Sequence, residues 1–333
     1  MVNLGVKSLY SLILLGFILY LPLFTAIGEV AGGVWVFLPL VVMYFFAPLA
    51  DLVLIKFFPD WQKVNIFKYS QYQLVDLGLK FYPLIQWSLF IYFMFKYQNS
   101  TEGLSISGIM MGLTSGGAGL LVAHELMHRK DKISQFGASA LCMMVGYAHW
   151  PMEHVHGHHK NVATPLDPCT AKKGDILYGF YFRSVIGQIF SAYRINRSHF
   201  LKVKLIELIL LGSLFYYFGL NGVIFWGVQA LVGTFLLENL NYVEHYGLLR
   251  KKNPSGRYSK VLPEHSWETR SILSNMSVIN LGLHSDHHAL VDKKFWELES
   301  VPNTSSLNIG IPGQMLLSLV PPLWFQYMQR RMS

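Results

Sequence analysis

The chain of 333 residues is 52% hydrophobic and only 14% charged, whereas an ordinary soluble domain is roughly 25% charged. This composition excludes a soluble globular domain and is typical of a membrane protein. The net charge of +8 does not indicate nucleic-acid binding, because no basic helix interleaved with aromatic residues is present. We therefore expect no nucleic-acid partner.

Cysteine chemistry is not expected to carry the function. The chain has two cysteines, Cys142 and Cys169, and they form no CxxC pair. Such a pattern predicts neither a disulfide framework nor a cysteine-based metal site.

Six apolar segments approach the length of about 20 residues that a membrane-spanning helix needs. The first is too long for the apolar part of a signal peptide and has no convincing cleavage site, so we expect it to be retained as a span. We predict an all-α integral membrane protein with six transmembrane helices, of which the third and the fifth are short. These spans are expected near residues 8–25, 34–54, 81–95, 104–123, 205–218 and 223–237.

The positive charges predict the orientation of these spans. Of the 27 lysines and arginines, 26 fall on the side of the N-terminus, and only Lys96 falls on the other side. Cytoplasmic loops carry an excess of positive charge. Residues 124–204 and 238–333 are therefore expected to be cytoplasmic.

Two further apolar stretches, at residues 136–150 and 313–328, are too short to span a membrane. They predict helices that are buried in protein or lie at the membrane surface. We expect residues 1–333 to form one domain, with a membrane half and a cytoplasmic helical cap rich in histidine.

All thirteen histidines follow residue 123, and this topology places them on the cytoplasmic side or at its membrane edge. In HELMH, where the fourth span ends, His124 and His128 are spaced i and i+4, so both rings lie on one face of a helix. EHVHGHH and LHSDHHA repeat that spacing with an adjacent third ring, and NYVEHYG adds one histidine after the sixth span. The predicted metal ligands are His124, His128, His154, His158, His159, His245, His284, His287 and His288.

One such cluster in isolation is more typical of a solvated helix end. HELMH also matches the HExxH pattern of zinc proteases, in which Glu125 would be the general base. Nine histidines exceed the three protein ligands of a catalytic zinc site and also exceed the four to six ligands, roughly, that one transition-metal ion accepts. We therefore predict two ions. Imidazole suits iron, zinc, copper and nickel, and redox chemistry beside lipid favours iron.

Carboxylates recur beside these rings. A ligand histidine usually donates its second N–H to a carboxylate or carbonyl, which fixes the orientation of the ring. The alternative is that these side chains point elsewhere and serve as helix caps or surface charges. The residues concerned are Glu125, Glu153, Glu244 and Asp286.

Together, the motifs HELMHRK, EHVHGHHKNVATPLDP, NYVEHYGL and LHSDHHA resemble the signature of the integral-membrane di-iron alkane hydroxylases. These enzymes are a branch of the membrane fatty acid desaturase and hydroxylase superfamily. The resemblance covers much of the second half of the chain, including HSW at residues 265–267 and LVPPLWF at residues 319–325. NYVEHYG distinguishes this branch from the desaturases, whose three histidine boxes also take HxxxH and HxxHH forms.

The resemblance implies six transmembrane helices, two iron ions bound by the same nine histidines, and transfer of one oxygen atom from O2 to the terminal methyl group of an alkane. The product would be a primary alcohol, and the hydrocarbon substrate would come from the bilayer. The resemblance also places Asp167, an acidic position of the family, near the metals and makes His265 a further candidate partner of the ligands. Gly282 and Leu283 depart from it, because the family commonly has Gln-Arg before the last box.

The resemblance also implies partners and a location. The two CxxC pairs of the rubredoxin that is fused to several family members are absent from this sequence, so a separate rubredoxin and its reductase are expected as electron donors. The expected location is the bacterial inner membrane, with the metal site on the cytoplasmic side.

Two alternatives remain open. A desaturase, or a hydroxylase of another lipid or of an aryl methyl group, would use the same metals and differ in its product. A metal-binding or transport protein without catalysis belongs to a different class, and the lack of charged residues deep in the spans argues against it.

Overall fold

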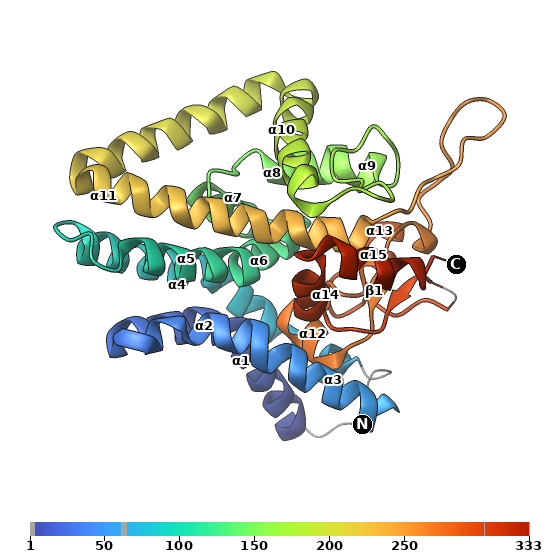
Figure 1. Cartoon of the computed structure of the whole chain (residues 1–333), viewed down its shortest axis with the longest axis horizontal. Helices are drawn as coiled ribbons and strands as arrows, with labels where there is room; N and C mark the ends of the chain where they lie inside the picture. The colour runs from blue at the N-terminus through green and yellow to red at the C-terminus, as the bar shows by residue number, and fades with distance from the viewer. Residues whose placement is uncertain (1–3, 61–64, 303, 333) are drawn as a thin grey trace.

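The computed structural model describes residues 4–60, 65–302 and 304–332, and its regular secondary structure is almost entirely helical. Figure 1 shows the long helices side by side, with the shorter elements of the second half gathered at one end. The first half of the chain contains α1 (Leu4–Ala31), η1 (Gly33–Phe37), α2 (Leu38–Val41), η2 (Val42–Phe46), α3 (Ala47–Phe57), η4 (Ile66–Tyr69), α4 (Tyr72–Tyr97), α5 (Leu104–Thr114), η5 (Ser115–Gly119), α6 (Leu120–Met127), α7 (Lys132–Met144), α8 (Trp150–Glu153), η6 (His154–His158) and α9 (His159–Asn161).

The second half begins with two long helices, and shorter elements follow them. Two strands of two residues each pair in parallel, with Glu268 opposite Ser306. The elements are α10 (Leu177–Ile195), α11 (Arg197–His245), η7 (Pro263–His265), β1 (Glu268–Thr269), α12 (Ile272–Ser277), α13 (His284–Ala289), β2 (Ser306–Leu307), α14 (Ile311–Ser318) and α15 (Pro321–Gln329).

Five helical segments in the described residues are long and apolar enough to cross a membrane. Helices suit this environment because each backbone group finds its hydrogen-bond partner within the segment. The prediction of a helical membrane protein is therefore confirmed. The segments are Gly5–Ala31, Gly33–Phe57, Tyr72–Tyr97, Leu104–Met127 and Arg197–His245.

The predicted number of six spans is not confirmed, because the fifth and sixth predicted spans lie in one helical segment. α11 has 49 residues and contains Gly219 with non-helical backbone angles, φ 62° and ψ −157°. Figure 1 shows the two arms of α11 on either side of this bend. Glycine adopts positive φ without the steric cost that other residues incur.

The helices also extend beyond the predicted boundaries of the spans, most clearly at the start of two of them. α4 begins at Tyr72, nine residues before the predicted start, and α11 begins at Arg197 instead of residue 205. Both extensions contain charged residues, such as Asp76 and Lys202, which lower the hydropathy without interrupting the helix. The helices therefore extend beyond the apolar stretches that predicted them.

α5 and α11 pack closely enough to require glycine. A Cβ atom added to Gly112 would lie 2.6 Å from Cβ of Val232 and 2.9 Å from the carbonyl oxygen of Gln229. Small residues spaced four apart allow such a close approach between membrane helices, and Gly116 continues the same face against Gly233. Because α5 leads through η5 into α6, and α11 ends at His245, this packing helps to bring two histidine-bearing helix ends together.

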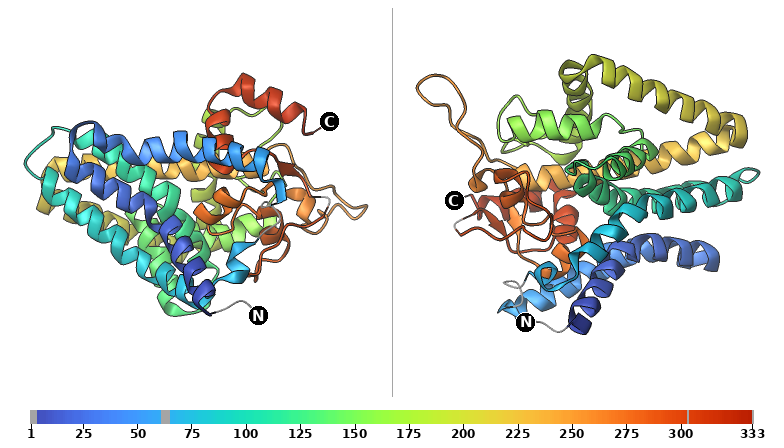
Figure 2. Two further views of the ribbon diagram at one scale, coloured as in Figure 1. Left: turned by 90° about the horizontal axis from the view of Figure 1, so that it is seen from below. Right: turned by 180° about the vertical axis from the view of Figure 1, so that it is seen from behind.

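The C-terminal segment covers one end of the membrane helices. In all three views the elements α12 to α15 lie at the same end of the molecule, away from the turn between α4 and α5 (Figures 1 and 2). α7 covers residues 136–144 of the first short apolar stretch, and the stretch at residues 313–328 is divided between α14 and α15. The predicted helices are confirmed there, whereas residues 145–149, at the end of the first stretch, are not helical.

A buried carboxylate attaches this segment to the second membrane segment. Asp51 of α3 is 1% exposed, and it accepts hydrogen bonds from the hydroxyls of Ser271 and Ser274, the latter at 2.7 Å. Oγ of Ser274 in turn accepts a hydrogen bond from the backbone N–H of Ile311 at 2.9 Å. Asp51 therefore connects α3 with α12 and, through Ser274, with α14.

Replacing Asp51 with alanine is expected to lower the free energy of unfolding by about 1–3 kcal/mol, because two buried hydroxyls lose their acceptor. Thermal unfolding of the purified protein in detergent measures this effect. Asp51→Asn keeps one acceptor oxygen and is expected to lie between Asp51→Ala and the parent protein. Equal melting temperatures for Asp51→Ala and the parent protein would contradict this role.

Candidate metal centre

The structure brings the nine predicted ligand histidines together in two groups. Within each group the potential ligand atoms all lie within 4.8 Å of one another. His128 is partly exposed, and the other eight are buried. The five-histidine group consists of His124, His128, His154, His159 and His287, and the four-histidine group consists of His158, His245, His284 and His288.

The backbone of η6 determines how the three ligand histidines of EHVHGHH are divided between the two groups. η6 is a π-helical turn, and the backbone N–H of His159 donates to the carbonyl of His154. A π-helical turn aligns residues five apart and is frequent at functional sites. Nε2 of His154 and Nε2 of His159 consequently lie 3.0 Å apart in one group, whereas His158 belongs to the other group. The i, i+4 pairing of His154 with His158 expected from the spacing is therefore wrong.

The short helix α13 supplies both groups. His284 and His288 are one helical turn apart, and their Nε2 atoms lie 3.0 Å from each other. His287 points instead to the five-histidine group, where its ring centroid lies 4.7 Å from that of His124. α13 thus lies between the two groups and links them.

The donor atoms have the spacing that a transition-metal ion requires. Two donor atoms bound to one ion at about 2.1 Å lie roughly 3.0 Å apart at a right angle and roughly 3.4 Å apart at a tetrahedral angle. Nε2 of His284 lies 3.2 Å from Nε2 of His245, and Nε2 of His158 lies 3.3 Å from Nε2 of His288. In the five-histidine group, the buried Nε2 atoms of His124, His128 and His287 have no hydrogen-bond partner among the described residues. These residues therefore fit two metal ions.

Burial keeps most of these rings neutral, which is the form that binds metal. It lowers the pKa of His128 to about 3. Burial and the neighbouring imidazoles also hold the pKa values of five further rings well below the ordinary value; these are His154, His159, His284, His287 and His288. No proton competes for their nitrogens at neutral pH.

Asp167 contacts a ligand ring on the nitrogen that faces away from the four-histidine group. Its Oδ2 lies 3.1 Å from Nδ1 of His158, and it also accepts hydrogen bonds from the backbone N–H of Cys169 and the hydroxyl of Thr170. Burial acts to lower the pKa of His158, but Asp167, together with the carboxylates of Glu153 and Glu238, raises that pKa above its ordinary value. Asp167 thus fixes the orientation of His158 and favours a proton on Nδ1, which leaves Nε2 free.

Among the other candidate partners of the ligands, only Glu244 has a recorded polar contact with a ligand ring in the described residues: its Oε2 lies 3.3 Å from Nε2 of His284. The remaining four make other contacts. Glu125 pairs with Arg129 at 2.5 Å, Glu153 accepts from Ser191 at 2.7 Å, Asp286 pairs with Lys293 at 2.7 Å, and His265 accepts from the backbone N–H of Leu262 at 2.9 Å.

Arg129 is a buried residue that the sequence analysis did not select. It pairs with Glu125 and, at 3.0 Å, with Asp76 of α4. Its guanidinium also lies 5.0 Å from the ring centroid of Trp296. Arg129 therefore connects the end of α6, which carries His124, with α4 and with the C-terminal segment. The sequence feature that could have identified Arg129 is its position directly after HELMH.

The neighbours of Gly282 explain why glycine precedes the last histidine cluster. An added Cβ atom would lie 2.5 Å from Oδ1 of Asn275 and 2.8 Å from Cγ2 of Thr269. The Asn275 side chain is held in place by hydrogen bonds to the carbonyls of Thr269 and Ser271, both at 2.9 Å. A glutamine at position 282 would require this turn to repack.

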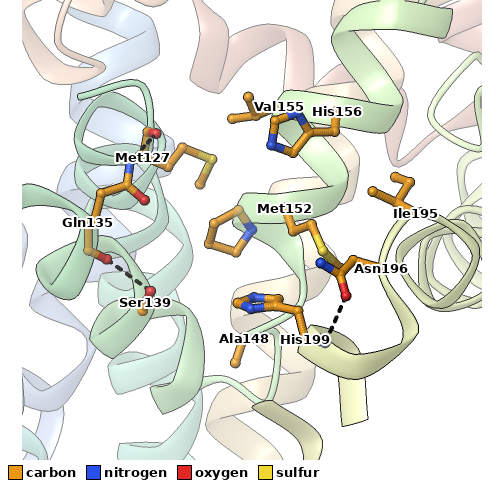
Figure 3. Close-up of a pocket in the computed structure, with 11 residues that line it drawn as sticks. Met127, Gln135, Ser139, Ala148, Met152, Val155, His156, Ile195, Asn196 and His199 are labelled. Carbon is orange, nitrogen blue, oxygen red and sulfur yellow. Dashed lines mark hydrogen bonds between the residues drawn. The ribbon is translucent and has the colours of Figure 1, made fainter. Parts of the chain in front are cut away.

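Two of the histidines outside the ligand set, His156 and His199, line a separate pocket of about 380 Å³. Figure 3 shows them facing this pocket together with Asn196, on the opposite side from Met127 and Gln135. A third, His149, is buried beside Tyr147, with ring centroids 4.7 Å apart. Within the described residues, none of these three belongs to a group that could hold a metal ion.

The fold and the site define an integral-membrane protein with a histidine-rich metal site at one end of its spanning helices. Comparison with known proteins narrows this class. A model of the fatty acid desaturase family matches residues 103–303. Alkane 1-monooxygenase from Ectopseudomonas oleovorans is 32% identical, with 90% of this chain and 78% of that protein aligned.

Alkane 1-monooxygenase 1 from Alcanivorax borkumensis is 30% identical, over 90% of this chain and 78% of that protein. The hydroxylase component of xylene/toluene monooxygenase from Pseudomonas putida is 28% identical, over 92% of this chain and 85% of that protein. The chain therefore belongs to the alkane hydroxylase family of membrane oxidoreductases, within the fatty acid desaturase superfamily.

Proposed function

We propose that the two histidine groups bind two iron ions and that the protein uses O2 to hydroxylate the terminal methyl group of an alkane or similar hydrocarbon. The convergence of nine histidines in two groups, in a chain related to alkane 1-monooxygenases, carries this proposal. Bound iron would supply the reduction of O2 and the oxidation of the C–H bond. The first group would hold one ion through five nitrogens and the second group the other through four.

The protein's own residues would prepare the site for this chemistry. Burial excludes water from eight of the nine rings, which protects a reactive oxidant from side reactions. Asp167 keeps the proton of His158 on Nδ1, directed away from the ion. The close packing of α5 against α11 holds the helix ends that carry His124 and His245 in fixed positions.

The hydrocarbon would enter from the bilayer, because an alkane has no polar group by which it could be bound and must be positioned by shape. A groove of about 460 Å³ lies between α1 and the η2–α3 segment and is lined by Phe17, Tyr20, Phe46 and other apolar side chains. Its wall includes Leu273 of α12, the helix before α13. We propose this groove as the point of access.

We also propose that residues 1–333 function as one domain in the bacterial inner membrane, with the metal site on the cytoplasmic side. The charge asymmetry supports this orientation, since 26 of 27 lysines and arginines lie on the side of the histidines. A separate rubredoxin, reduced by its reductase, would supply the electrons. A basic face suits an acidic electron carrier, because complementary charges guide association.

A second candidate is hydroxylation of an aryl methyl group. The similarity to the xylene/toluene monooxygenase component covers 92% of this chain, so this substrate class fits the same metal site. A desaturase reaction is supported less, because the three similar proteins named in the comparison are all monooxygenases. The products, a primary alcohol, a benzylic alcohol or an alkene, distinguish these reactions.

NADH consumption tests the proposed electron path. With purified protein loaded with iron, NADH oxidation is expected to require rubredoxin, its reductase and a hydrocarbon together. The control omits the hydrocarbon and measures uncoupled oxidation. If flavodoxin supports the same hydrocarbon-dependent rate when rubredoxin is left out, the proposed donor is wrong.

A further inference from the structure

A surface pocket of about 320 Å³ lies where the loop after EHVHGHH meets α10 and the segment that follows α11. Two leucines, Leu166 and Leu249, line it and are 67% and 53% exposed. Lys172 and Arg183 line it as well, and both are exposed. We call it the Leu166 pocket. Apolar side chains that gather in an exposed hollow, with charged residues around them, are typical of a surface that binds a partner.

The buried residue Asp167 also lines this pocket and connects it with the four-histidine group. Its Oδ2 lies 3.1 Å from Nδ1 of His158. The other nitrogen of that ring, Nε2, lies 3.3 Å from Nε2 of His288 within the group. One carboxylate and one imidazole therefore separate the pocket from the position that an ion would occupy. Because electron transfer slows steeply with distance, a carrier bound at this pocket would have a short path to the site.

The walls of the pocket are fixed to the segments that carry the ligands. The segment after His245 is joined to the loop after EHVHGHH by two backbone hydrogen bonds. The N–H of Gly247 donates to the carbonyl of Ala171 at 2.8 Å, and the N–H of Arg250 donates to the carbonyl of Ala163 at 2.7 Å. The pocket is therefore a built part of the surface beside the four-histidine group, and a partner would meet a preformed site.

The charges around the pocket favour an acidic partner. Among the described residues that line it, Asp167 is the only carboxylate, and it is engaged by His158. The side chain of Arg183 pairs with Asp175 at 2.5 Å but remains 41% exposed. Lys160 and Lys251, in the two segments that form the walls, are also exposed. Such positive charge around an apolar centre complements an acidic protein surface.

We infer that the Leu166 pocket is the docking site of an acidic one-electron carrier protein. The inference rests on the proposed function and locates its electron donor on the surface. Each reduced carrier would lose one electron at this site, and NADH, through the reductase, would return two electrons to two carriers. Two such electrons, two protons and O2 convert one hydrocarbon into one alcohol and one water.

The affinity for rubredoxin tests this assignment without requiring turnover. Oxidised rubredoxin is titrated into the full-length protein in detergent, and the Kd is measured. Leu166→Glu is expected to raise the Kd by at least about 10-fold, because a carboxylate would face an acidic partner. Ile133→Glu is the matched control, since Ile133 is also 67% exposed but lies on α7 and does not line the pocket. It is expected to keep the Kd of the parent protein.

Two further measurements distinguish docking from a structural role. Lys172→Glu is expected to raise the Kd and to make it less sensitive to ionic strength, because salt screens exposed charges. Leu166→Glu should retain both irons and, after chemical reduction with dithionite, should form as much alcohol in a single turnover as the parent protein. With NADH, reductase and rubredoxin, its KM for rubredoxin should rise by at least about 10-fold.

Unchanged Kd values in both Leu166→Glu and Lys172→Glu would overturn the assignment. A changed oligomeric state of Leu166→Glu, with the affinity for rubredoxin unaltered, would also overturn it and would assign the pocket to a second copy of this chain. Absence of rubredoxin binding by a parent protein that holds two irons would refute the proposed electron donor itself, and this surface with it. That result is distinct from normal binding by the parent and both variants, which refutes the location alone.

Discussion

Replacing His287 with alanine is expected to abolish hydrocarbon hydroxylation and to leave about one tightly bound iron per chain in place of two. His287 lies at the middle of the five-histidine group, where its ring centroid is 4.7 to 4.8 Å from those of His124, His128 and His159. Its Nε2 is buried and has no other partner among the described residues. The affinity for that iron should fall by at least about 100-fold, since even partners of ligands contribute roughly 10–100-fold.

The control for this variant is His156→Ala. His156 lies in the same part of the sequence as three predicted ligands, but it lines the separate pocket of Figure 3. It is expected to retain both irons and hydrocarbon-dependent turnover. Iron analysis and turnover are measured on the same preparations. Full iron occupancy and full activity in His287→Ala would contradict the proposed ligand set.

Asp167→Ala is expected to weaken iron binding by the four-histidine group by about 10–100-fold. The substitution removes the acceptor that orients His158 and also leaves the backbone N–H of Cys169 and the hydroxyl of Thr170 without their acceptor. Without the Asp167 carboxylate, the pKa of His158 loses the hydrogen bond and the charge that raise it most, so that pKa falls, although Glu153 and Glu238 still act to raise it. Loss of affinity is therefore attributed to the orientation of the ring and not to competition by protons.

The dependence on pH separates these two explanations. In the parent protein, Asp167 raises the pKa of His158, so iron uptake by this group should weaken as the pH falls and the ring becomes protonated. In Asp167→Ala this loss should begin at a lower pH, although the affinity at neutral pH is weaker. Iron titrations of the parent, Asp167→Ala and Asp167→Asn at several pH values measure both effects. An Asp167→Ala protein that binds iron as the parent does across this range would contradict the role of Asp167.

The sequence predicted which histidines gather but not how they divide. His124 and His128 share a group because i, i+4 spacing on a regular helix places two rings on one face. The same reasoning fails for His154 and His158, because η6 is a π-helical turn that aligns His154 with His159. No residue type specifies such a turn reliably, and it depends on packing with neighbouring helices.

The spans were predicted from the length of the apolar segments, and this length does not show whether two neighbouring segments form separate helices. The bend at Gly219 lies in a short connection that contains no charged residue. The two predicted spans are therefore joined in one bent helical segment, and the sequence does not show whether the helix is interrupted between them. Asp51 lies more than 200 residues away in the sequence from its hydrogen-bond partners Ser271 and Ser274. Such long-range pairing has no periodic signal, whereas the histidine spacings have one.

Product analysis tests the central claim most directly. Membranes that contain the protein are given rubredoxin, its reductase, NADH and ¹⁸O₂, together with alkanes, fatty acyl esters or methylarenes, and the extracts are analysed by gas chromatography and mass spectrometry. The account predicts a primary alcohol from an alkane, with one ¹⁸O atom in each molecule, and no product from His287→Ala membranes. An alkene as the product, or an alcohol whose oxygen comes from water, would contradict it.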